Sequence, residues 1–152
     1  MATIQAKDLT KEFPRSPYDE LEGFPWLPRL IDKVRSLDAG KIGEYTPYPC
    51  GGDQGFLGTF GLDADALKAV ISGGASDEEI GRWVVEHAGA DAKAKQEAYR
   101  QQQRAPLTPP MSDYLKGSLD ELKAARPDLD LTGVDNWSKM ICKEENYSIP
   151  QA

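Results

Sequence analysis

The side chains best suited to chemistry are gathered in residues 43–55, GEYTPYPCGGDQG. This segment contains two carboxylates and two phenols, namely Glu44, Asp53, Tyr45 and Tyr48. A carboxylate can act as a general base when burial raises its pKa, and a phenol can donate a hydrogen bond or a proton. We therefore predict acid–base catalysis on a small molecule, with these residues as catalytic candidates. The structural alternative is that Asp53 caps a helix, the tyrosines cover the core and Glu44 pairs with an arginine.

Two further side chains with reactive chemistry are Cys50 and His87. Cys50 precedes a predicted helix start, where the positive helix end favours the thiolate form and a nucleophilic role. His87 is the only histidine, and in the last turn of a predicted helix it is suited to act as a base or a pH-sensitive contact. The structural alternatives are a buried inert thiol and a histidine packed beside Trp83. We count His87 among the catalytic candidates and Cys50 among the substrate contacts.

Arginines near this segment predict a small anionic or polar organic ligand. Guanidinium groups bind carboxylates and phosphates through paired hydrogen bonds, so Arg15 and Arg29 are candidate clamps, with ion pairing as the alternative. Gln54 and Trp26 complete the predicted substrate contacts. The glycines match neither GxxxxGK[ST] nor GxGxxG, so they do not predict a phosphate loop. We predict no cofactor, and no HExxH, EF-hand or Glu-x-x-His pattern predicts a metal site.

The elements that must position these residues are helices. The clearest helix begins near Pro28 and ends at Gly40, and its apolar face is formed by Leu27, Leu30, Ile31, Val34 and Leu37. Arg29, Asp32, Lys33 and Arg35 fall on its other faces. Trp26, just before the helix, is predicted to pack back on it.

The remaining chain predicts several shorter helices. They run from Gln54 to Phe60 with Asp53 as cap, from Asp63 to Ile71, from Ser76 to Ala88, from Asp91 to Arg104, from Ser118 to Arg126, and around Trp137 to Ile141. Ser76–Glu79 and Ser118–Glu121 are capping-box patterns at two of these starts. The buried face of the helix after Ser76 is predicted to include Trp83 and His87. Residues 43–55 contain two prolines and four glycines, which predict an irregular loop.

The predicted fold is mostly α: a compact single domain over residues 1–152, with about six helices, an irregular Gly/Pro/Tyr-rich loop and at most a minor β element. Residues 1–23 are predicted to form an extended N-terminal arm, because Pro14 and Pro17 interrupt any helix there. Residues 105–117 are predicted to form a Pro-rich connection, and residues 147–152 a loose tail.

The composition and charge of the chain argue against several classes of function. The net charge of −7 and the pI of about 4.7 argue against nucleic acid and anionic membrane surfaces as partners. No apolar run reaches the roughly 20 residues that span a bilayer, and the N-terminus lacks a signal-peptide core. The two cysteines do not form a CxxC pair, and we predict a cytoplasmic protein. The alternative to an enzyme is a non-catalytic interaction or self-association module, such as a homodimer.

Several motifs resemble one known family. DLTKEFPRSP at residues 8–17, WLPRLIDKVRS at 26–36, GEY at 43–45 and DQGFL at 53–57 resemble the bacterial domain-of-unknown-function family 5069. DEEIGRW at 77–83 and VDNW at 134–137 are similar to weaker parts of the same pattern, so the resemblance spans most of the chain. It implies a compact, mostly helical fold and implies no activity. Gly51, Gly52 and Gly55 depart from the family pattern, as does the proline-rich segment 107–112.

Overall fold

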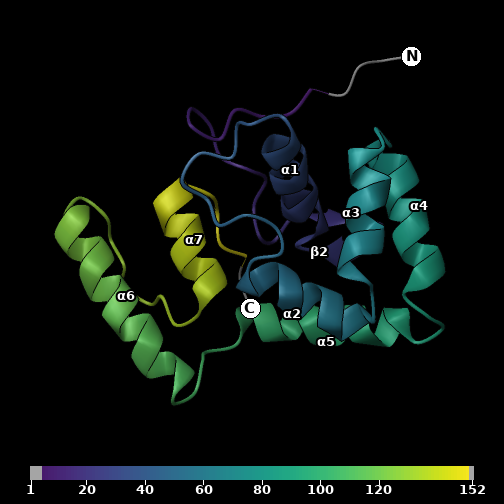
Figure 1. Ribbon diagram of the computed structural model, residues 1–152. Helices are drawn as coiled ribbons and strands as arrows, with labels where there is room; N and C mark the ends of the chain where they lie inside the picture. Colours follow the sequence, from purple (N-terminus) through teal and green to yellow (C-terminus); the bar gives the residue numbers. More distant parts are fainter. Residues whose placement is uncertain (1–4, 151–152) are drawn as a thin grey trace. The chain divides into compact units, whose positions relative to one another are not determined.

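The computed structural model describes residues 5–150, in which seven helices and one two-stranded sheet form a mostly α fold (Figure 1). The predicted fold class is therefore confirmed. The chain divides into two compact units, residues 1–99 and residues 100–152. That the whole chain forms one domain stays a prediction. None of the helices within residues 5–150 is long and apolar enough to cross a membrane.

The first unit begins with an arm that ends in a small sheet. The sheet is antiparallel, with β1 (Glu20–Leu21) paired to β2 (Phe24–Pro25), and it is the minor β element that the sequence allowed. Glu22 and Gly23 make the turn with φ of 52° and 78°. Earlier in the arm, Leu9 is buried, and its main-chain N–H donates to Lys41 O at 2.8 Å. The first four residues of the predicted arm lie outside the described part of the chain.

Helices make up the rest of the first unit: α1 (Leu27–Asp38), α2 (Gly51–Phe60), α3 (Ala64–Ser72), α4 (Asp77–His87) and the first part of α5 (Ala92–Arg104). α1 packs against α3, and α3 against α4 (Figure 1). The predicted caps are present, because Asp63 accepts from the Ala66 amide at 2.8 Å and Ser76 accepts from the Glu79 amide at 3.1 Å. These local hydrogen bonds explain why the starts of α3 and α4 follow from the sequence.

The core of the first unit combines the apolar face of α1 with aromatic rings from β2 and α2. Leu27, Leu30, Ile31 and Val34 are fully buried, as predicted. Phe24 and Phe60 meet edge to face with ring centroids 4.9 Å apart, and Phe56 lies 5.0 Å from Phe60. The polar faces of α1 are covered as well, since Arg29, Asp32 and Lys33 are buried. Buried charged groups must be paired or hydrogen-bonded inside the protein, so these three side chains require partners from neighbouring elements.

The second unit contains the end of α5, α6 (Met111–Ala125) and α7 (Trp137–Glu145). Asn136 accepts from the Lys139 amide at the start of α7, and its side-chain amide donates to Gln103 O and Ala105 O at the end of α5. The predicted start of a helix at Ser118 is wrong, because α6 begins at Met111 and includes residues 111–117 of the predicted connection. Residues 147–150 are in no helix or strand, and residues 151–152 lie outside the described part.

Candidate functional site

The centre of the candidate site is the start of α2. The helix begins at Gly51, with Cys50 as its N-cap residue in an extended backbone conformation. The predicted start at Gln54 is therefore wrong, and residues 51–55 are helical despite three glycines. Asp53 does not cap the helix from the N-cap position. It lies one turn inside, and its Oδ2 accepts a hydrogen bond from the Cys50 main-chain N–H at 3.0 Å.

Asp53 is held by several partners and has no exposed surface. Its Oδ1 accepts a hydrogen bond from the indole Nε1 of Trp26 at 2.9 Å. Its Oδ2 lies 3.6 Å from Nζ of Lys33, in an ion pair whose two side chains are 0% and 4% exposed. A buried carboxylate needs such compensation, because removing it from water is costly. The Asp53 carboxylate therefore has a structural role, because it accepts hydrogen bonds from Trp26 and Cys50 and pairs with Lys33.

Lys33 joins this carboxylate to a thiol. Its Nζ lies 3.1 Å from Sγ of Cys50, within the hydrogen-bond range for sulfur. Cys50 is half-buried, whereas Lys33 is buried, so the sulfur is the accessible member of the pair. We call these three residues the Lys33–Cys50–Asp53 cluster. It places an ammonium group between a carboxylate and a partly exposed sulfur.

Trp26 and Gly52 form the wall beside the cluster. Trp26 has a left-handed backbone, with φ of 75°, at the N-cap of α1. A Cβ atom on Gly52 would lie 2.6 Å from Cη2 of Trp26 and closer still to Cζ2. Only glycine therefore allows α2 to approach the indole ring that hydrogen-bonds Asp53. This is a physical reason for a glycine directly after the start of α2.

Arg29 lies above the same wall. Its guanidinium carbon is 5.7 Å from the ring centroid of Trp26 and 5.8 Å from that of Tyr45, which are cation–π distances. One guanidinium nitrogen donates to the main-chain oxygen of Arg15 at 3.2 Å. Arg29 is buried, and its guanidinium contacts the rings of both Trp26 and Tyr45.

Tyr48 lies at the other end of the segment and faces α3. Its hydroxyl donates to Ala64 O at 2.8 Å. Burial raises the pKa of Tyr48, and the negative charges of Asp53 and Asp65 raise it further. The phenol is therefore protonated at neutral pH, with its proton engaged by α3. Burial likewise raises the pKa of Tyr99 on α5, with Asp53 and Cys50 nearby as further causes.

The other predicted residues lie at the surface or in other contacts. Glu44 and Gln54 are exposed, and the Gln54 amide donates to Pro49 O at 3.1 Å. Arg15 pairs with Asp32 and with Asp77, at 3.0 and 2.8 Å. His87 was predicted on a buried face, but it is exposed. Its ring stacks on Trp83 with centroids 4.0 Å apart, and its Nδ1 lies 2.7 Å from Trp83 O.

The structure thus brings together part of the predicted site and adds two residues to it. Trp26, Arg29, Tyr45, Cys50 and Asp53 gather at the start of α2, whereas His87 and the Arg15 guanidinium are engaged in other contacts. Lys33 and Tyr99 were not among the predicted site residues. For Lys33 a signal existed, because Trp26, Arg29 and Lys33 are spaced along one helical stripe. Nothing local indicated Tyr99, which comes from a helix about fifty positions further along.

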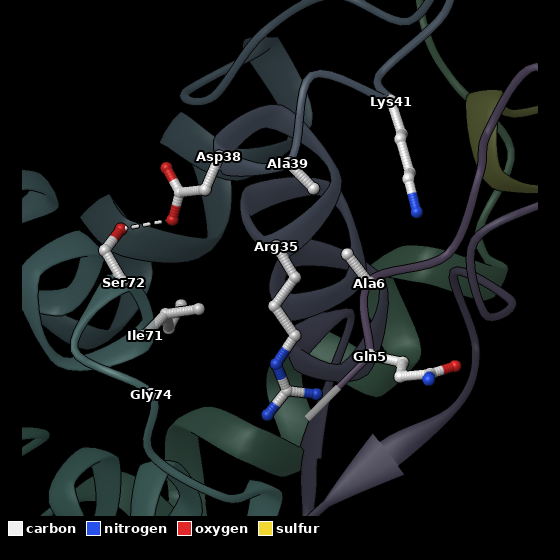
Figure 2. Close-up of a pocket in the computed structure, with 9 residues that line it drawn as sticks. All are labelled: Gln5, Ala6, Arg35, Asp38, Ala39, Lys41, Ile71, Ser72 and Gly74. Atoms are coloured by element: carbon white, nitrogen blue, oxygen red, sulfur yellow. Dashed lines mark hydrogen bonds between the residues drawn. The ribbon is translucent and has the colours of Figure 1, made fainter. Parts of the chain in front are cut away.

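A cavity of about 470 Å³ lies elsewhere in the first unit (Figure 2). It is open and is lined by the ends of α1 and α3 and by residues 5 and 6 of the arm, including Arg35, Asp38, Lys41 and Ser72. Ser72 donates a hydrogen bond to Asp38 at 2.6 Å at its edge (Figure 2). No residue of segment 43–55 lines this cavity. Within residues 5–150, no three His, Cys, Asp or Glu side chains are grouped as metal ligands.

Comparison with known protein families identifies a match. A family model described as "Domain of unknown function (DUF5069)" matches residues 11–146, which is most of the chain. No curated protein matches the sequence.

Proposed function

The chain belongs to the family described as Domain of unknown function (DUF5069), a description that names no activity, and we propose that it is a small-molecule enzyme whose reacting group is Cys50. The proposal keeps the predicted location in residues 43–55 and changes the reacting residue. One observation carries it: the buried Lys33 ammonium lies 3.1 Å from the Cys50 sulfur. The predicted Asp53 base is not retained, because the Trp26 indole, the Cys50 amide and Lys33 already occupy its carboxylate.

The chemistry proposed is nucleophilic catalysis. The nucleophilic form of a cysteine is the thiolate. The positive charge of Lys33 lies 3.1 Å from the Cys50 sulfur, the sulfur lies at the N-terminus of α2, and Asp53 holds Lys33 in place. The sulfur attacks the carbonyl carbon of an activated ester or thioester, and the leaving group departs with the bonding electron pair. Water then attacks the carbonyl carbon of the acyl–enzyme, the C–S bond breaks, and the Cys50 sulfur keeps the electron pair. A carboxylic acid is released, so the net reaction is hydrolysis.

We also propose a class of substrate and a cellular location for this enzyme. A small polar organic substrate is favoured, because the sulfur lies at the edge of a short segment in which Glu44 and Gln54 are exposed. A free, partly exposed thiol persists in a reducing compartment, which supports a cytoplasmic location.

The test is turnover of p-nitrophenyl acetate and a panel of small thioesters by the purified full chain. We expect hydrolysis above the buffer rate, with a burst of p-nitrophenol that matches the enzyme concentration. Cys50→Ser is expected to reduce turnover to the buffer rate and Lys33→Met to reduce it strongly. Cys142→Ala is the matched control, because Cys142 is fully buried on α7, and it should keep turnover. Equal turnover by wild type and Cys50→Ser would overturn the proposal.

A second candidate function, a self-association module, is supported by two side chains on α6. Met111 and Tyr114 are 44% and 62% exposed, and their spacing places them on one side of the helix. If copies of the chain pair through this surface, sedimentation will show a dimer that Tyr114→Ser weakens. A concentration-independent monomer would reject this candidate and leave the enzyme proposal untouched.

A further inference from the structure

The contact between Lys33 and Cys50 has a second chemical consequence, which does not depend on the proposed activity. Nζ and Sγ are 3.1 Å apart, and the lysine is held in that place by Asp53 and by its own burial. We propose that oxidation by a peroxide joins Cys50 to Lys33 through a covalent sulfur–nitrogen bond. The pair is then a modification site that ties the start of α2 to α1.

Cys50 is the thiol that a small peroxide reaches. It is half-buried at the start of α2, whereas Cys142 is fully buried. Oxidation of cysteine depends on exposure and on thiolate character. A sulfenic acid formed at Cys50 therefore has the Lys33 nitrogen as an immediate neighbour, and sulfenic acids condense with nitrogen as well as with thiols.

The reaction balances with one peroxide. In the first step the Cys50 sulfur takes one oxygen from hydrogen peroxide, the O–O bond breaks, and one water leaves. The sulfur loses two electrons, the peroxide gains them, and the product is a sulfenic acid. In the second step the Lys33 ammonium releases one proton to solvent, and the neutral amine attacks the sulfur. The S–O bond breaks, and the hydroxyl departs as water with a second proton from the nitrogen.

The bond changes the charges at the cluster. A sulfenamide nitrogen is neutral, so Asp53 loses the ammonium that faces it at 3.6 Å. A buried carboxylate without its counter-charge is destabilising. Oxidation is therefore expected to lower the stability of the α2 start, and reduction by a thiol to restore it, since the S–N bond is cleaved by thiols.

The experiment uses the full chain with Cys142→Ala, which removes a disulfide between Cys50 and Cys142 of one chain as a source of the same mass change. The protein is treated with hydrogen peroxide in native buffer, alkylated and digested with trypsin. We expect the peptide of residues 30–35, uncut after Lys33, joined to the peptide of residues 42–68. The mass of the joined pair should be two hydrogens below the sum of the two peptides, and dithiothreitol should separate them.

Two variants keep the test decisive. Lys33→Arg keeps a positive charge beside Asp53. Its oxidation should give a sulfenic acid that dimedone traps, and no joined peptide should form. Lys33→Met should give the same result if it folds. A Cys142→Ala chain that retains Lys33 and is oxidised only to sulfinic acid, with normal cleavage after Lys33, would overturn the inference. A joined pair that retains an oxygen would also overturn the S–N assignment. If the joined peptide forms in a protein that does not hydrolyse esters, this inference stands and only the proposed activity is rejected.

Discussion

Gly52 is the residue on which the geometry of the candidate site depends most directly. The glycine itself is exposed to solvent. Its special property is that a Cβ atom would lie 2.6 Å from Cη2 of Trp26, whose indole donates to the buried Asp53. Adding one methyl group here would push the indole away from the carboxylate or shift the start of α2.

Gly52→Ala is therefore expected to destabilise the protein by ~1–3 kcal/mol, the usual cost of overpacking. Gly55→Ala is the matched control in the same helix, because a Cβ atom there meets nothing within 4 Å. The control should gain ~0.5–1 kcal/mol, since alanine is the better helix former. Urea unfolding of both variants measures the difference. A Gly52→Ala protein as stable as Gly55→Ala would show that the Trp26 contact is not tight.

The predicted catalytic groups have different surroundings in the fold. Two of the main candidates are engaged by partners from other parts of the chain. Asp53 pairs with Lys33 and Trp26, and Tyr48 donates to Ala64 O. Within the Lys33–Cys50–Asp53 cluster, the sulfur of Cys50 is the partly exposed atom. A sequence pattern indicates which groups are present, whereas availability depends on partners from other helices.

At the scale of elements, α6 shows how a good local signal can mislead. Ser118–Glu121 has the capping-box pattern, yet it lies inside α6, which already begins at Met111. The amides of Ser112 and Tyr114 donate to Thr108 O and Pro110 O, so the preceding prolines lead into the helix. Proline is tolerated in a first helical turn, and a capping pattern cannot reveal whether a helix has already started.

Gly117 provides a test of this boundary. It lies within α6, and a Cβ atom there meets nothing within 4 Å. Gly117→Ala should therefore raise the unfolding free energy by ~0.5–1 kcal/mol, as for an open site inside a helix. Gly133→Ala is the contrasting variant, because φ of +77° strains any other residue there, and it should destabilise. A neutral Gly117→Ala result would favour a helix that starts at Ser118.

At the scale of the whole first unit, one ion-pair network joins distant parts of the chain. Asp77 at the start of α4 pairs with Arg15 of the arm and with Arg35 of α1, each at 2.8 Å. Arg15 also pairs with Asp32 at 3.0 Å. Burial opposes ionisation of Asp77, but the hydrogen bonds and charges of Arg15 and Arg35 outweigh it and lower the pKa of Asp77 below its usual 3.8.

This network predicts acid sensitivity. A carboxyl group whose pKa is lower in the folded than in the unfolded state stabilises the fold fully above the unfolded value. That contribution is lost as the pH falls through the lower, folded pKa. Stability measured by urea unfolding should therefore drop with acid below about pH 4 more steeply for wild type than for Asp77→Asn. Glu78→Gln, an exposed change in the same helical turn, should keep the wild-type slope. Equal slopes for wild type and Asp77→Asn would show that the network does not hold the carboxylate.

The sequence by itself determined the helical class of the fold and most of the helices. The apolar face of α1, the Asp63 and Ser76 caps, and the glycine that ends α1 are local features, so local spacing is enough to predict them. Only the tertiary structure decided which polar groups are buried together. Lys33 became the partner of Cys50 and Asp53, and His87 became exposed, because other parts of the chain cover one face of a helix and leave another open. Such burial depends on contacts between residues far apart in sequence, and helical periodicity contains no information about them.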